Sequence, residues 1–165
     1  MSVVRDSSRS SCVTLEYMQP QIPVLQVAAK AAIINGDGKV LIVREAESGP
    51  NNTIIGKYTL VGGRIEPGEA FTEGLKREIL EETGLVVTPK IPLQIGEWRP
   101  VIRGIQHQII AIFMLCEAND TKVRLSIEHD RYDWIYPKDR KKYPMIEPDC
   151  FVVDGLINND PHLTN

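Results

Sequence analysis

The sequence predicts an α/β protein in which a mixed β-sheet lies between layers of helix, as an α/β/α sandwich. One observation is a strand–turn–strand pattern across residues 25–44, and a second is an amphipathic helical pattern across residues 69–83. The third is the segment IIAIFMLC at residues 109–116, which is apolar on both faces and is therefore typical of a central strand covered by helices. A further amphipathic helix, expected across residues 144–158, supplies the remaining layer.

The first strands are expected as a hairpin that leads toward the functional site. Residues 25–34 are a strong strand candidate, residues 39–44 form the returning strand, and the turn Asn-Gly-Asp-Gly lies between them at residues 35–38. A loop at residues 48–56 follows, and we expect it to border the site. Residues 57–61 then form one short strand that enters a glycine-rich loop.

Beyond the first helix, we expect a long hairpin followed by two short strands. An extended stretch starts at residues 85–87 and is broken by Pro89 and Pro92. The remaining expected elements are a hairpin of residues 93–102 and 107–117 around the turn Arg103-Gly104, strands at residues 123–127 and 132–135, and a solvated turn at His129 and Asp130 between them. In the last helix we expect Phe151, Val152 and Leu156 on the apolar side.

Length and charge limit the domain organisation and the classes of partner. The 165 residues are enough for one domain with a proper core, and we assign residues 22–165 to it. Residues 1–21 are polar and serine-rich and are expected to form a flexible lead-in, in which residues 13–18 would allow a short edge strand. The net charge of −3 offers no basic surface for nucleic acid.

The cysteines and the hydropathy pattern favour a cytoplasmic protein. Cys12, Cys116 and Cys150 lie far apart without the spacing of a metal site, which is typical of free thiols in a reducing compartment. No apolar run approaches the roughly 18–20 residues of a membrane span, and the first residues lack a hydrophobic signal core. We therefore expect no membrane partner. The sequence leaves the oligomeric state open, a homodimer included.

Three glutamates of the first expected helix form one acidic patch. At about 100° per residue, Glu78 and Glu82 lie only about 40° apart on the helix surface, and Glu81 lies about 60° to the other side of Glu78. Such a patch repels itself unless a cation binds, and oxygen ligands suit Mg²⁺ or Mn²⁺. The alternative is a solvated acidic helix face. Ile79 lies next to the patch and belongs to an apolar stripe, so the acids should flank the surface that the helix buries.

The segment GRIEPGEAFTEGLKREILEETGL at residues 63–85 resembles the Nudix box, G-x5-E-x7-R-E-U-x-E-E-x-G-U, where U is aliphatic. It agrees at every fixed position: Gly63, Glu69, Arg77, Glu78, Ile79, Glu81, Glu82, Gly84 and Leu85. The chain is thus similar to Nudix hydrolases, more weakly across roughly residues 24–140. The resemblance implies the Nudix-type α/β/α sandwich and Mg²⁺-dependent hydrolysis of a phosphoric anhydride in a small nucleotide.

The resemblance also implies roles within the box. Glu78, Glu82 and the carbonyl of Gly63 would bind the metal, and Glu81 would complete the shell or act in catalysis. Arg77 is expected to pair with Glu69 or another box glutamate and to fix the carboxylates. An internal brace without a direct role is the alternative for Arg77 and Glu69.

Outside the box, Glu128 stands six residues before Trp134 (EHDRYDW), and many Nudix hydrolases carry a further glutamate upstream of a tryptophan as base or extra ligand. The alternative for Glu128 is a solvated turn. Tyr58, Trp98 and Arg99 are candidates for stacking on a base or binding phosphate. The alternative for Trp98 is half-buried packing.

Three functions follow from the resemblance, in order of preference. The first is hydrolysis of a nucleoside diphosphate linked to another group, such as ADP-ribose, because Pro100 lies near where relatives that cleave ADP-ribose tend to carry a proline. The second is hydrolysis of nucleoside triphosphates, oxidised ones such as 8-oxo-dGTP included, with release of pyrophosphate. The third is a ligand-sensing module without turnover, for which damaged box glutamates would be expected.

Overall fold

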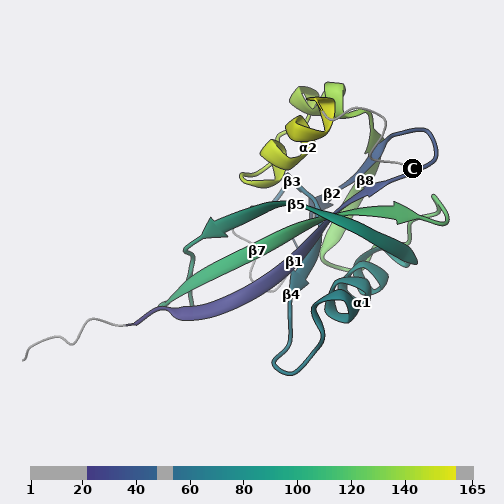
Figure 1. Cartoon of the computed structure of the whole chain (residues 1–165). Helices are drawn as coiled ribbons and strands as arrows, with labels where there is room; N and C mark the ends of the chain where they lie inside the picture. Colours follow the sequence, from purple (N-terminus) through teal and green to yellow (C-terminus); the bar gives the residue numbers. More distant parts are fainter. Residues whose placement is uncertain (1–21, 48–53, 159–165) are drawn as a thin grey trace, which may run out of the picture.

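The computed structural model describes residues 22–47 and 54–158 (Figure 1). Its elements, in chain order, are β1 (Val24–Ile34), β2 (Val40–Glu45), β3 (Tyr58–Thr59), β4 (Val61–Arg64), α1 (Phe71–Thr83), β5 (Val87–Trp98), β6 (Val101–Ile102), β7 (Ile105–Ala118), β8 (His129–Ile135), the 3₁₀ helix η1 (Pro137–Lys142) and α2 (Asp149–Asn158). The expected lead-in at residues 1–21, with its edge strand, and most of the expected loop at residues 48–56 lie outside the described residues.

The strands form one mixed, twisted sheet, as predicted. Its main order is β3-β2-β1-β7-β5, with β4 paired to β1, β6 to β7 and β8 to β2. The long central strands β1 and β7 run parallel, whereas the other pairings are antiparallel. The strand β7 lies between β1 and β5, so the apolar segment within it is a central strand, as expected.

Helices cover the two faces of this sheet, and each face has its own core (Figure 1). Along β1, Ala28 and Ala32 pack with residues of α2, while Ala29 and Ala31 pack with residues of α1. The α2-side core also contains Tyr58, Leu60, Ile109, Phe113, Val152 and Val153, and the α1-side core also contains Leu41, Val43, Leu75, Ile79, Met114 and Cys116. The alternation along β1 and β7 therefore fills both layers of the sandwich.

The β1–β2 turn is built as expected. The side-chain Oδ1 of Asn35 accepts hydrogen bonds from the backbone N–H groups of Asp37 and Lys39, both at 3.0 Å. Gly38 has a φ of 73°, a conformation that glycine adopts without steric cost. This local turn chemistry is what made the hairpin predictable from sequence.

The prediction of a single strand at residues 57–61 is wrong. The chain changes partner at Leu60, so that β3 pairs with β2 and β4 pairs with β1. The backbone N–H of Leu60 donates instead to Asp149 Oδ2 at 2.7 Å. The change of partner places Gly62 and Gly63 within β4, paired to β1, and not in the expected loop.

The prediction that Pro89 and Pro92 interrupt the strand is also wrong, since both lie within β5. The strand β5 pairs only with β7, and an edge strand tolerates residues without an N–H donor on its free side. The ladder does shift register between Pro89 and Pro92 and again after Pro92. The prolines thus distort the pairing locally without ending the strand.

Residues 123–127 do not form the expected strand. The backbone N–H groups of Arg124 and Ser126 donate to the carbonyls of Thr83 and Glu82, at 2.8 and 3.0 Å. The last carbonyls of a helix have no hydrogen-bond donors within the helix, and this segment supplies donors to two of these carbonyls. The contact fixes the end of α1 against the segment that leads into β8.

The final helix is shorter than predicted. It begins at Asp149, after Pro148, and the residues between Tyr143 and Pro148 are not helical. Its buried residues are Asp149, Cys150, Val152 and Val153, whereas Phe151, expected on the apolar side, is exposed. Among the described residues, no helix is long and apolar enough to cross a membrane.

Candidate active site

A cavity of about 700 Å³ opens where β1, β4, the C-terminal half of α1 and the start of β8 meet. Among the described residues that line it, the acidic ones are Glu45, Glu66, Glu78, Glu81, Glu82 and Glu128. The lining cations are Lys30 and Arg64. The cavity thus gathers five predicted site residues from distant parts of the chain, namely Gly63, Glu78, Glu81, Glu82 and Glu128, together with Trp98.

The helix α1 carries the acidic patch and docks as predicted. Leu75 and Ile79 are fully buried, and the patch lies beside this stripe, which places Glu78 and Glu82 at the rim of the cavity. The helix starts two residues later than the expected Glu69, after a non-helical Ala70. It ends at Gly84, whose φ of 70° is the predicted left-handed cap.

Two glycines of β4 let the backbone approach these carboxylates. Gly62 has a φ of 130°, and its N–H donates to Glu82 Oε2 at 3.1 Å. A Cβ on Gly62 would overlap the backbone of Ala29, and one on Gly63 would overlap the Glu78 carboxylate. Gly62 therefore requires glycine, whereas a side chain at Gly63 would displace the Glu78 carboxylate.

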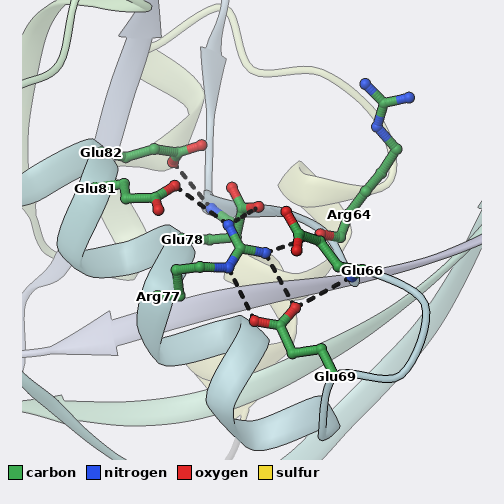
Figure 2. Close-up of polar contacts among 8 residues, drawn as sticks. Arg64, Glu66, Glu69, Arg77, Glu78, Glu81 and Glu82 are labelled. Atoms are coloured by element: carbon green, nitrogen blue, oxygen red, sulfur yellow. Dashed lines mark hydrogen bonds and ion pairs between the residues drawn. The ribbon is translucent and has the colours of Figure 1, made fainter.

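Arg77 pairs with Glu69, as predicted, and also with two carboxylates of the patch (Figure 2). Its Nε and one terminal nitrogen contact the two oxygens of Glu69 at 2.9 and 3.1 Å, a bidentate arrangement. The other terminal nitrogen contacts Glu78 Oε1 at 2.8 Å and Glu81 Oε2 at 3.2 Å. Glu69 also accepts the backbone N–H of Glu66 at 3.1 Å, so it ties the loop to the helix.

The pKa shifts of the glutamates separate Glu69, which pairs with Arg77, from Glu78 and Glu82, which line the cavity. Hydrogen bonds from Arg77 lower the pKa of Glu69, which stays ionised. Burial raises the pKa of Glu78, and it raises the pKa of Glu82 to about 7 against the opposing effects of His129 and the Gly62 N–H. The two carboxylates that face the cavity are therefore costly to ionise unless a cation compensates them.

The donor set fits a hard divalent cation in chemical type. Carboxylate oxygens and a backbone carbonyl are the ligands that Mg²⁺ and Mn²⁺ prefer, and burial of Glu82 makes a nearby cation favourable. Within residues 22–47 and 54–158, however, no three His, Cys, Asp or Glu side chains already form a ligand cluster. One Glu78 oxygen is engaged by Arg77 instead.

His129 is buried, which corrects the prediction of a solvated turn. It is 6% exposed and lines the cavity, with Nε2 at 3.6 Å from Glu45 Oε1. Burial alone would lower its pKa, but Glu45, Glu82 and Glu128 together raise it. Its neighbour Asp130 is exposed, as expected, and makes an ion pair with Arg44 at 2.7 Å.

The candidates for substrate contact are placed unequally. Trp98 lines the cavity and also packs on the α2-side core, which agrees with the half-buried alternative. Tyr58 is 5% exposed within that core, and its hydroxyl donates to Asp133 at 3.1 Å, so it is not available to stack on a base. Arg99 is exposed, pairs with Glu97 at 2.7 Å and does not line the cavity.

Lys30 and His129 also line the cavity, and neither was predicted as a site residue. Lys30 is the single charge within the apolar stretch VAAKAAII, and a charge inside such a stretch was the available signal. His129 lies between Glu128 and Asp130, and these charged neighbours favoured a solvated turn where the structure has the first residue of β8.

We expect the metal-free protein to lose stability as the pH rises from 4.5 to 7. The pKa of Glu82 is raised from 4.5 to about 7, so the folded state binds more protons than the unfolded state in this interval and the free energy of unfolding falls. Above pH 6.5, the raised pKa of His129 acts in the same direction, because its favourable charge is lost as the pH rises. Melting temperatures in EDTA across this interval test the expectation, and a rising melting temperature would contradict it.

Comparisons with known proteins agree with this geometry. A family model described as the NUDIX domain matches residues 24–149. The nucleoside triphosphatase NudI of Escherichia coli O1:K1 / APEC is 29% identical over 120 residues, which cover 68% of this chain and 84% of that protein.

Two solved structures share the fold. The MutT protein of Methanosarcina mazei Go1 has a TM-score of 0.71 and 25% identity and covers 82% of this chain and 94% of its own. The MutT NUDIX hydrolase of Burkholderia pseudomallei has a TM-score of 0.66 and 21% identity, and the match covers 79% of this chain and 97% of that protein.

Proposed function

The chain belongs to the NUDIX domain family of hydrolases that act on phosphoric anhydride bonds, and from this premise we propose that it hydrolyses nucleoside triphosphates to nucleoside monophosphates and pyrophosphate. The observation that supports this substrate class is the similarity to a nucleoside triphosphatase over 84% of that relative's length. The sequence alone favoured nucleoside diphosphates linked to another group, and the comparisons favour the reverse order. The four box glutamates are intact, which speaks against a sensing module without turnover.

The metal-binding residues in this proposal are Glu78, Glu81, Glu82 and the Gly63 carbonyl. When bound, Mg²⁺ or Mn²⁺ neutralises phosphate charge and makes a water molecule more acidic. Support comes from the shared cavity, in which Glu82 is buried and Glu78 is half-buried. Arg77 holds one oxygen of Glu78 and is itself held by the bidentate contact with Glu69, which limits the rotamers of the carboxylate.

In the reaction, water attacks a phosphorus atom, and the anhydride bond on the opposite side of that atom breaks. The pyrophosphate group leaves with the bonding electron pair, and a carboxylate oxygen of Glu128 accepts the proton of the attacking water. Support for this role of Glu128 is its place on the cavity wall, on the segment that precedes β8, where its charge is close enough to raise the pKa of Glu78. Its exposed side chain has room to reach a substrate-bound water.

Glu128→Gln should lower kcat by about 10²–10⁴-fold, because a general base contributes about that factor. The binding of substrate should change little, since the amide keeps the size and an acceptor oxygen. Initial rates of pyrophosphate release with Mg²⁺ measure the effect. Glu147→Gln serves as the matched control, because Glu147 is exposed and lies outside the cavity. A Glu128→Gln variant that keeps more than half of the wild-type kcat would move the base to another residue.

A panel of nucleotides with Mg²⁺ tests the substrate class. Triphosphates should release pyrophosphate, which is scored with inorganic pyrophosphatase. Nucleoside diphosphates linked to another group, ADP-ribose among them, should instead yield phosphomonoesters that require alkaline phosphatase for detection. A higher kcat/KM for ADP-ribose than for any triphosphate would overturn the proposal in favour of the first reading of the sequence.

A further inference from the structure

A lysine is buried in the middle of β1 and still reaches the cavity. The side chain of Lys30 is 10% exposed, and it lies on the α2 side of the sheet among apolar neighbours. Its Nζ donates to Thr59 Oγ1 at 2.6 Å and to Asp149 Oδ2 at 2.7 Å. The three side chains come from β1, β3 and the first turn of α2, so the cluster joins three elements at the cavity wall.

Stability alone does not account for this cluster. A buried ion pair loses hydration on both charges, and apolar replacements of similar volume are often neutral or stabilising. The pair is also incompletely satisfied, because Asp149 Oδ1 is buried without a hydrogen-bond partner among the described residues. Asp149 Oδ2, by contrast, accepts from Lys30, Thr59 and the Leu60 N–H. Thr59 and Asp149 thus fix the position of the Lys30 ammonium group, which apolar core packing would not require.

The ammonium group has a donor to offer to a ligand. It carries three N–H donors, and two of them meet acceptors among the described residues. Lys30 lines the cavity, so an acceptor on a bound molecule can take the third. The charge of Lys30 is already compensated by Asp149 at 2.7 Å, and a neutral acceptor therefore suits it better than a phosphate, which would face the same carboxylate.

The surrounding wall suits a flat ring. Ala28, Leu60, Ile109 and Trp98 line the cavity beside Lys30 and belong to, or pack on, the same α2-side core. The glutamates of the cavity lie on other elements, namely β2, the segment between β4 and α1, α1 itself and the segment before β8. Lys30 is close enough to Glu82 for its charge to lower the pKa of that carboxyl. A nucleotide whose phosphates approach the acidic rim would thus place its base against the apolar wall.

We infer that Lys30 determines base specificity by donating a hydrogen bond to a ring carbonyl of the nucleobase, which selects carbonyl-bearing bases against adenine. Uracil, thymine, guanine, cytosine and hypoxanthine carry such a carbonyl, and adenine does not. This inference rests on the proposed function, because it assigns the base of the same nucleotide. A buried donor left without an acceptor is costly, so the expected discrimination is roughly tenfold or more in kcat/KM.

The first test compares dITP with dATP on the wild-type enzyme, because these purines differ mainly by a carbonyl in place of an amino group. We expect dITP to exceed dATP by roughly tenfold or more in kcat/KM, and dUTP, dCTP and dGTP also to exceed dATP. Hydrolysis of all five at equal kcat/KM would overturn the inference and leave the proposed function standing. If none of the five is hydrolysed, the proposed function fails.

A binding measurement tests base selection independently of hydrolysis. Calorimetric titration of dIMP and dAMP with Mg²⁺ reports base selection without hydrolysis, because neither monophosphate contains an anhydride bond, and dIMP should bind roughly tenfold more tightly. Equal binding of the two monophosphates, or binding of neither, would overturn the inference whatever the enzyme hydrolyses.

Variants then assign the preference to Lys30. Lys30→Met should bring the dITP/dATP ratio toward one, because it should lower dITP hydrolysis more than dATP hydrolysis. Because this change leaves the Asp149 carboxylate buried without its cation, Lys30→Met/Asp149→Asn removes both charges and keeps an acceptor for the Leu60 N–H. Lys90→Met is the matched control, since Lys90 makes an ion pair at 2.8 Å with Glu117 and neither residue lines the cavity.

The pattern across substrates decides the role. If the two Lys30 variants lower kcat/KM equally for dITP and dATP, the lysine contacts a part that both share, such as phosphate or sugar, and the base assignment is wrong. An unchanged dITP/dATP ratio in folded variants would likewise overturn it.

Discussion

Excess EDTA should reduce hydrolysis to background, and added Mg²⁺ or Mn²⁺ should restore it. The cavity wall carries six glutamates against two cations, and a triphosphate adds several negative charges of its own. Without a divalent ion, these charges repel, and charge neutralisation by a bound metal supplies several kcal/mol of transition-state stabilisation. We therefore expect a loss of at least about 10³-fold in the rate of pyrophosphate release.

The chelated protein should nevertheless remain folded, because its stability comes from the two apolar cores on either side of the sheet. Circular dichroism and a cooperative thermal transition in EDTA check this point. Turnover that persists in fully chelated enzyme would contradict a metal-dependent mechanism. Unfolding on chelation would show that the metal is structural, and the loss of rate would then carry no information about catalysis.

The parts of the fold that the sequence predicted are those set by local chemistry. The turn after β1 follows from the Asn35 side chain and Gly38, and the end of α1 follows from Gly84. The 3.6-residue period placed Leu75 and Ile79 in the core and Glu78 and Glu82 at its rim. Each of these depends on residues within one or two turns of chain.

The errors arose where a distant segment supplies the hydrogen-bond partner. The β3–β4 break at Leu60 depends on Asp149, 89 residues away. Residues 123–127 face the end of α1 instead of another strand, and β5 tolerates its prolines only because it lies at the sheet edge. None of these partners is visible in a local pattern.

The same limit divides the candidate site. The α1 patch was predictable because one helix carries it, whereas Lys30 enters the cavity through a cluster with Asp149 that spans 119 residues. His129 was concealed because its burial depends on the packing of β8 against β2. Tyr58 was misassigned for the converse reason, since an aromatic residue near a glycine loop is equally suited to a core position.

Glu82→Gln should lower kcat by about 10²–10⁴-fold. The same change should stabilise the metal-free protein at neutral pH. The amide keeps the volume of the side chain and can still accept the Gly62 N–H, which lies at 3.1 Å from Glu82 Oε2. What it removes is a buried negative charge that a divalent ion requires. Burial raises the pKa of this carboxyl from 4.5 to about 7, which corresponds by linkage to about 3 kcal/mol of destabilisation above pH 7.

The opposite signs of the two effects are what identify Glu82 as a site residue. A residue that only supports the fold would lose stability and rate together, whereas a buried ligand without its metal destabilises the fold that it serves. In EDTA at pH 8, we expect the melting temperature of Glu82→Gln to exceed that of the wild type by several degrees, since about 1 kcal/mol corresponds to roughly 2–4 °C at this size. Glu73→Gln on the exposed side of α1 is the matched control and should change neither quantity much. A slow Glu82→Gln variant that is also less stable would make Glu82 a structural residue, and the metal would then have to be held by Glu78 and Glu81.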